Sequence, residues 1–245
     1  MKKHLFIATL FLSGLFGMQE EAENPHAQLT HLNLSHNEFT NIQFIVQFSN
    51  VRSLTLKGCH TLENNYYPVQ YLTKLEELNL NKVLFSDLTP LIPLKCLKKL
   101  SMQQSMVTTI RPLLELTQLK HLDVSSSRNI TDIHLIGLML NLTRLKMEVI
   151  FTEDMRSYTT LQFSGSIRAL KRLDVSYNLY DDVSCIKNIP NLQVLSLRGC
   201  YDIKSYDFLL ECPKLEKIYI NNDQPPKHIK DALGDKLILK SPHSN

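Results

Sequence analysis

One short pattern, L-x-x-L-x-L, recurs through this chain and constrains its fold more than any other feature. The copies start 22 to 28 residues apart, and in each copy the last two apolar residues alternate with polar ones. That alternation predicts a β-strand with one buried face. Because a unit this short cannot bury its own apolar edge, neighbouring copies must stack and share one core. The nine copies begin at Leu29, Val51, Leu75, Leu97, Leu119, Leu142, Leu170, Leu192 and Leu215.

The segment downstream of most predicted strands carries apolar residues three positions apart. In the fourth copy these residues are Ile110, Leu113 and Leu116. A spacing of three indicates a short helix or 3₁₀ turns with one buried face. Parallel strands lie about 4.8 Å apart, whereas helical segments are roughly 10 Å wide. The stack is therefore expected to curve, with the sheet on its concave side.

Two units show the repeat most clearly. Residues 75–96 read LEELNLNKVLFSDLTPLIPLKC and residues 97–118 read LKKLSMQQSMVTTIRPLLELTQ, with Pro90 and Pro112 at equivalent places. Both resemble the 22-residue class of leucine-rich repeats found in bacterial internalin-type proteins, and the resemblance extends over about residues 29–240. It implies an α/β fold, a curved right-handed leucine-rich-repeat solenoid (horseshoe). Its parallel β-sheet would line the concave face and its short helical or 3₁₀ segments the convex face. The resemblance also implies recognition of protein partners.

The ninth position of each copy departs from that family's pattern in two places. It normally carries Asn or Cys, whose side chain satisfies backbone groups in the turn after the strand. Val83 and Ile150 cannot form such hydrogen bonds, which predicts a broken ladder and irregular turns there. The sixth copy also contains an insertion near residues 151–163, with the polar stretch TEDMRSYTT, which we interpret as a tolerated loop rather than a functional one. The residues at the ninth position are Asn37, Cys59, Val83, Ser105, Ser127, Ile150, Asn178, Cys200 and Asp223.

The two ends of the chain differ from the repeats. Residues 1–27 are predicted to be a signal peptide and leader, because a basic start precedes an uncharged run and then acidic residues. The alternative is a buried N-terminal capping helix, and the run is too short to span a bilayer. Residues 28–240 are predicted to form the leucine-rich-repeat domain, nine repeats with a terminal cap, and residues 241–245 a tail. The predicted cap has Ile229 and Leu233 on a last helical face and Leu237 and Leu239 on a closing strand.

The composition argues against several classes of function. Net charge is +3 without a basic stripe, so no nucleic-acid partner is expected. The sequence has no C-x-x-C pair, phosphate loop, G-x-G-x-x-G or G-x-S-x-G motif, so we expect no enzyme activity, no metal and no cofactor. The five cysteines are expected to be free thiols, because Cys59 and Cys200 hold the same turn position six repeats apart. His31 and His121 are expected on the sheet surface, too far apart to share an ion.

The residues that would face a partner follow from the phase of the repeat. The third, fifth and seventh positions of each copy project outward from the sheet, and the Arg and Tyr residues among them concentrate in copies six to nine. Because Arg and Tyr are the residues most often found as binding hot spots, we predict a protein-binding site on this part of the concave face. The alternative is a solvated sheet whose charges pair across strands. The predicted site residues are Arg144, Lys146, Arg172, Asp174, Tyr177, Arg198, Lys217 and Tyr219.

These features together predict a non-catalytic protein-binding scaffold of the cell-surface or host-interaction type. We expect a monomer that is exported to a secreted, periplasmic or cell-surface location, without stable membrane insertion once the leader is removed. The alternative is an intracellular leucine-rich-repeat scaffold or substrate adaptor in the cytoplasm, where reduced thiols are natural.

Overall fold

The computed structural model describes residues 28–150, 159–221 and 225–240. The predicted signal peptide and leader, the polar part of the insertion at residues 151–158 and the tail lie outside these ranges. None of the helices in the ranges described has the length and hydropathy needed to cross a bilayer.

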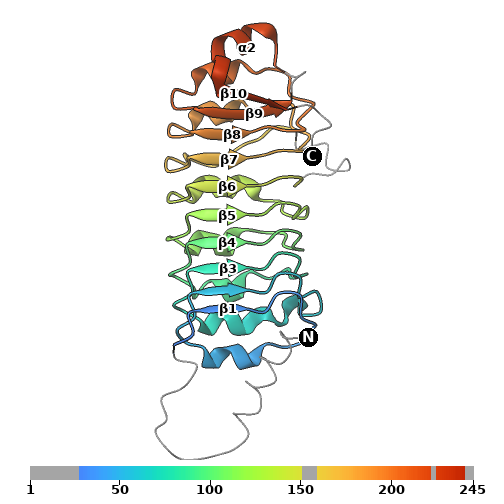
Figure 1. The fold of residues 1–245 in the computed structure, drawn as a ribbon, viewed down its shortest axis with the longest axis vertical. Coiled ribbons are helices and arrows are strands. Elements are labelled where there is room, and N and C mark those ends of the chain that lie inside the picture. The colour runs from blue at the N-terminus through green and yellow to red at the C-terminus, as the bar shows by residue number, and fades with distance from the viewer. Residues whose placement is uncertain (1–27, 151–158, 222–224, 241–245) are drawn as a thin grey trace, which may run out of the picture.

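The chain winds as a right-handed, curved leucine-rich-repeat solenoid around one parallel sheet, as the repeat pattern predicts (Figure 1). The sheet has 10 strands whose spatial order follows their order in the sequence. Each repeat therefore adds one strand beside the last, and the first strand and the closing strand lie at opposite ends of the stack (Figure 1). The strands are β1 (His31–Asn33), β2 (Ser53–Thr55), β3 (Glu77–Asn79), β4 (Lys99–Ser101), β5 (His121–Asp123), β6 (Arg144–Lys146), β7 (Arg172–Asp174), β8 (Val194–Ser196), β9 (Lys217–Asn221) and β10 (Leu237–Lys240).

The convex side consists mainly of 3₁₀ segments, which confirms the prediction from the spacing of three. They begin without side-chain caps, and their buried residues include those of the apolar triplets, such as Leu113 in η4. The 3₁₀ segments are η1 (Gln43–Gln47), η2 (Glu63–Tyr71), η3 (Thr89–Leu91), η4 (Arg111–Glu115), η5 (Ile133–Leu138), η7 (Ser184–Asn188), η8 (Asp207–Glu211) and η9 (Gly234–Lys236), and the α-helix is α2 (Lys227–Leu233).

The core is a continuous column of the apolar repeat positions. In the third repeat Leu75, Leu78 and Leu80 are all buried, whereas Glu77 and Asn79 between them face outward and are half-buried. The register aligns each leucine with its equivalent in the next strand, for example Leu78 with Leu100. The strand pattern predicted from the sequence is thereby confirmed. Over most of its length, the outward face of the sheet carries polar and charged side chains.

The eighth residue of each of the first eight repeats turns the chain out of the strand with a left-handed backbone. Gly58 and Gly199 have φ of +74° and +66°, but Lys82 and Val149 adopt φ of +61° and +53° without the freedom of glycine. For a β-branched residue such as Val149 this region is strongly disfavoured. The turns from His36 to Tyr177 share one backbone hydrogen bond: the N–H of Lys82, for example, donates to the carbonyl of Gln103 in the next repeat at 2.8 Å. The N–H of Gly199 instead donates to Oδ1 of Asn221 at 3.4 Å. The turn is therefore fixed by the backbone.

The prediction of irregular turns at Val83 and Ile150 is wrong. Lys82 and Val149, which precede them, have the same left-handed φ and donate the same inter-strand bond as their equivalents. Only the side-chain part of the ladder is interrupted. Asn178 of the next repeat compensates for Ile150: its Nδ2 donates to the carbonyl of Met147 at 2.8 Å, and its Oδ1 accepts the N–H of Ile150 at 2.9 Å. One buried amide thus joins two repeats.

Two places show how the stack ends and how it absorbs the insertion. At the N-terminal end Leu29 and Leu32 are only partly buried, because no repeat covers them within the residues described. At the C-terminal end Ile229 and Leu233 of α2 are buried and β10 pairs with β9, which confirms the predicted cap. Thr160, at the end of the insertion, forms a parallel β-bridge to Asp182, so residues after 158 belong to the fold.

Candidate binding trough

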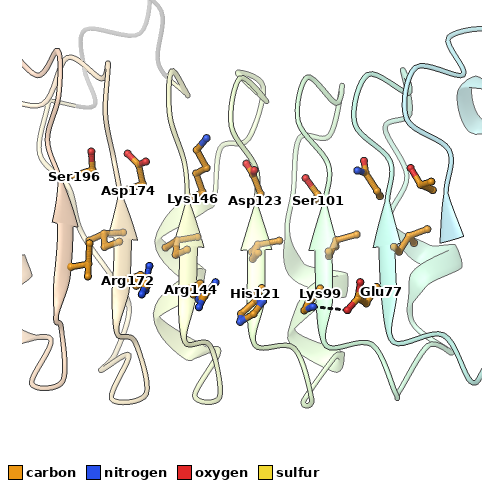
Figure 2. A pocket seen from close by; sticks show the side chains of 18 of the residues that line it. Glu77, Lys99, Ser101, His121, Asp123, Arg144, Lys146, Arg172, Asp174 and Ser196 are labelled. Carbon is orange, nitrogen blue, oxygen red and sulfur yellow. Dashed lines mark hydrogen bonds and ion pairs between the residues drawn. The ribbon is translucent and has the colours of Figure 1, made fainter. Parts of the chain in front are cut away.

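The concave sheet forms an open trough of about 840 Å³ that extends from β2 to β9. Two rows of outward residues follow the sheet, and those from β2 to β8, with Tyr219 of β9, line the trough (Figure 2). The first row holds the third residue of each repeat: His31, Ser53, Glu77, Lys99, His121, Arg144, Arg172, Val194 and Lys217. The second row holds the fifth residue: Asn33, Thr55, Asn79, Ser101, Asp123, Lys146, Asp174, Ser196 and Tyr219.

The first row changes character between β4 and β6. Glu77 and Lys99 are register partners and form an ion pair of 2.5 Å. Arg144 and Arg172 are register partners in the same way, but both are cations and both are exposed (Figure 2). His121 lies beside them, and burial followed by the charges of Arg144 and Lys99 lowers the pKa of its imidazole. At neutral pH the row thus presents two adjacent guanidinium groups.

The second row alternates in sign over the same strands. Lys146 has Asp123 and Asp174 as its register partners on either side. Its Nζ also lies 3.1 Å from a carboxylate oxygen of Glu148. Burial lowers the pKa of Lys146, but the hydrogen bond to Glu148 and the surrounding carboxylates outweigh it and raise that pKa. The ammonium group of Lys146 therefore stays protonated, and the neighbouring carboxylates balance its charge.

Glu148 and Asp174 are two neighbouring carboxylates, of which Asp174 lines the trough. Burial raises the pKa of Glu148, and the charge of Asp174 together with a hydrogen bond between the two side chains raises it further. Asp174 keeps its own partners, because its Oδ1 accepts the hydroxyl of Ser176 at 2.6 Å and the N–H of Ser176 at 3.1 Å. The pair can thus take up a proton more readily than an isolated glutamate does.

The predicted aromatic residues are held by packing. The guanidinium carbon of Arg198 lies 4.6 Å from the ring centroid of Tyr219, a cation–π arrangement that joins β8 to β9. Tyr177 lies after β7 with its ring against Gly199, where a Cβ atom would approach the ring to 2.3 Å. Gly199 is therefore required both by its positive φ and by the ring of Tyr177.

The structure places the predicted site residues in two groups. Six of them line the trough together and two, Tyr177 and Lys217, lie outside its lining. Tyr177 lies at the loop edge and is 56% exposed. The binding role of all eight stays a prediction. The residues that line the trough are Arg144, Lys146, Arg172, Asp174, Arg198 and Tyr219.

Two features of this surface were not predicted from the sequence. One is Glu148, whose importance depends on its cross-strand approach to Asp174, and no sequence spacing reveals that contact. The other is a set of exposed apolar side chains at the tenth position, on the loop edge that follows the strands. An apolar residue immediately after the buried ninth position is the signal that would have found them. They are Leu84, Met106, Leu179 and Tyr201.

The cysteines differ in burial, which affects the reactivity of their thiols. All five cysteines are free thiols, as predicted, and Cys59, Cys200 and Cys212 are buried. Burial raises the pKa of the Cys200 and Cys212 thiols to about 11, which disfavours the nucleophilic thiolate. Within the part of the chain that the structure describes, no group of three His, Cys, Asp or Glu side chains could hold a metal ion.

Comparison with known proteins identifies relatives of the fold. No protein-family model and no curated protein matches the chain. The structure is similar to internalin C2 from Listeria monocytogenes, with a TM-score of 0.54 and 21% identity over 79% of this chain and 72% of that one. It is also similar to an internalin, InlF, from the same organism, with a TM-score of 0.56 and 21% identity over 91% of this chain and 73% of that one. The mouse RP105/MD-1 complex gives a TM-score of 0.64 and 18% identity over 88% of this chain and 38% of that chain. At these identities the likeness establishes the leucine-rich-repeat fold.

Proposed function

We propose that this protein is a non-catalytic scaffold that binds a protein partner in the trough, over strands β6 to β9. One observation carries the proposal: the cationic and aromatic side chains of this region, unlike the ion-paired Lys99, lie together on an open surface. The Arg198–Tyr219 pair is already assembled, so little side-chain entropy is lost when a partner contacts it. One of the fold's structural relatives, RP105, was solved as a complex with MD-1.

Partner capture with three baits tests this proposal. The full chain and a variant with Arg172→Ala and Arg198→Ala are used to capture partners, and a variant with Arg128→Ala and Arg168→Ala serves as the control. The control removes two exposed cations that do not line the trough. Loss of two hot-spot arginines is expected to weaken partner binding roughly tenfold or more, with thermal unfolding nearly unchanged. A partner held equally well by all three baits contradicts the proposal.

Export to a secreted, periplasmic or cell-surface location is a separate part of the proposal, and the basic, apolar and acidic order of residues 1–27 supports it. Cell fractionation with N-terminal sequencing tests it: loss of about the first 17 to 27 residues outside the cytoplasm is expected. Retention of Met1 in the cytosol favours the second candidate, an intracellular scaffold or adaptor. The five free cysteines are the observation on that side, because reduced thiols persist in the cytoplasm.

A further inference from the structure

The adjacent arginines of the first row are not compensated by the sheet that carries them. Arg144 and Arg172 occupy register positions on neighbouring strands, and parallel strands place such residues about 4.8 Å apart. Like charges at facing positions destabilise a sheet. Neither arginine has an ion-pair partner among the residues described, whereas Lys99 in the same row is paired with Glu77. Two adjacent cations without a carboxylate between them are costly to the free protein.

The carboxylates nearest to Arg144 and Arg172 have other partners. Asp174 accepts two hydrogen bonds from Ser176. Asp123 accepts the amide of Gln103 at 2.7 Å and also the N–H of Ser125 at 3.0 Å. The remaining acidic neighbour, Glu148, pairs with Lys146. These three carboxylates are therefore held by other groups, and none of the described residues supplies a carboxylate that pairs with Arg144 or Arg172.

We propose that the partner supplies this charge: a carboxylate side chain on an extended, acidic segment binds between Arg144 and Arg172. This inference rests on the proposed function and specifies the chemistry of the partner. Two planar guanidinium groups on neighbouring strands offer parallel N–H donors, the geometry that matches both oxygens of a carboxylate. The next residue in the row, Val194, is half-buried and apolar. The segment thus meets two cations followed by a small apolar surface.

The charges around the arginines favour a carboxylate over a phosphate group. The second row and its edge hold Asp123, Asp174 and Glu148 against the single cation Lys146. Residues two apart on a strand lie roughly 6.6 Å apart. This excess of negative charge therefore lies close to an anion bound between Arg144 and Arg172. A dianion is repelled more strongly than a monoanion at that distance. The trough is also long and open, a shape that suits a polypeptide segment better than a small ion.

A peptide titration on the full chain tests the inference without the partner. The probes are a capped Ser-Glu-Ser-Glu-Ser peptide, its Gln counterpart and inorganic phosphate, with binding measured by calorimetry and by the shift in thermal midpoint. The Glu peptide is expected to bind and to raise the midpoint, and the Gln peptide to do neither. Binding is expected to weaken roughly tenfold in Arg144→Gln/Arg172→Gln, because both charge-assisted bonds are lost. Arg128→Gln, an exposed cation outside the trough, is the control and should leave it unchanged.

Further variants and probes distinguish a failure of this inference from a failure of the proposed function. Arg144→Lys/Arg172→Lys keeps both charges but loses the planar fork, so binding midway between the wild type and the Gln variant supports bidentate recognition. Binding of phosphate in preference to the Glu peptide overturns the inference, and so does equal binding of the Glu peptide by all variants. In both cases the proposed function can still stand, because it is judged by whether Arg172→Ala/Arg198→Ala loses the captured partner.

Discussion

Repeats three and four and repeats six and seven share one backbone but use their outward side chains differently. At the first row the earlier pair holds Glu77 against Lys99, an ion pair complete within the protein, whereas the later pair sets Arg144 beside Arg172. At the turn the earlier region has the side chain of Asn81, whose Oδ1 accepts the N–H of Gln103 at 2.8 Å. The later region has the buried amide of Asn178, which bonds to the backbone of Met147 and Ile150 in the preceding repeat. The later region thus has buried turn groups bonded across repeats, while Arg144 and Arg172 on its surface have no ion-pair partner among the residues described. That combination is typical of a binding site on a rigid support.

Replacing the buried amide should produce the largest change. In Asn178→Val the carbonyl of Met147 and the N–H of Ile150 lose the amide as their partner, whereas the carbonyl of Val175 keeps the thiol of Cys200 at 3.2 Å. Unsatisfied buried groups cost about 1–3 kcal/mol each, so a loss of about 3 kcal/mol in the free energy of unfolding is expected by urea denaturation.

The control for this change is Asn37→Val, the same substitution in the first repeat. There the amide donates only to Leu34 and Ser35 of its own turn, and the side chain is partly buried, so about 1 kcal/mol is expected. Equal losses at both positions would mean that the bond between repeats adds nothing.

Reversing one arginine should remove the difference between the two regions. Arg144→Glu faces Arg172 with a carboxylate and so reproduces the Glu77–Lys99 arrangement. Binding of an acidic peptide is expected to fall more than tenfold, or by about 1.4 kcal/mol, when measured by calorimetry. The thermal midpoint should stay level or rise, because a like-charge pair becomes an opposite-charge pair. An unchanged affinity would show that the two arginines do not act together.

Breaking the ion pair of the earlier region should have a smaller effect. Lys99→Gln leaves Glu77 without its partner, but the two side chains are 50% and 47% exposed. Exposed pairs contribute about 0–1 kcal/mol, so the loss in urea denaturation should stay below about 1 kcal/mol. The Lys99→Gln variant should bind the acidic peptide as tightly as the wild type does, in contrast to Arg144→Glu. A loss as large as that of Asn178→Val would contradict the view that this pair only balances charge.

The smallest expected effect is on pH dependence. Burial and the charge of Asp174 raise the pKa of Glu148, so the folded state binds its proton more tightly than the unfolded state does. Its contribution to stability is full below the ordinary glutamate pKa and is lost as pH rises through the raised value. Glu148→Gln should flatten this fall in the thermal midpoint between acidic and neutral pH. The converse case, Glu76, has a pKa lowered by Lys98 and Arg52, and Glu76→Gln should leave the fall intact.

The sequence was sufficient for the fold because each strand reports its phase through its leucines. Leu78 and Leu80 fix which residues face the core, and therefore also that Arg144 and Arg172 face outward. It was not sufficient for the turns. Nothing about Val149 suggests a left-handed backbone, which is imposed by the neighbouring strand.

The details of the site escaped prediction for a similar reason. Whether Arg198 is free or stacked on Tyr219 depends on rotamers set by packing. The position of the Tyr177 ring depends on Gly199 in the following repeat, which has no side chain to obstruct it. A repeat pattern assigns residues to a face, but contacts between the side chains on that face are decided in three dimensions.

Arginine side-chain NMR tests the central claim most directly. The claim is that the binding surface is the part of the trough around Arg144 and Arg172, whose charges have no ion-pair partner among the described residues. Each Nε–H group gives its own signal, so titration of the full chain with the acidic peptide reads all sites at once. The largest shifts are expected at Arg144 and Arg172, with little change at Arg52, which is already paired with Glu76 at 2.5 Å. Uniform shifts at every arginine, or the largest shift at Arg128 on the loop edge, would contradict it.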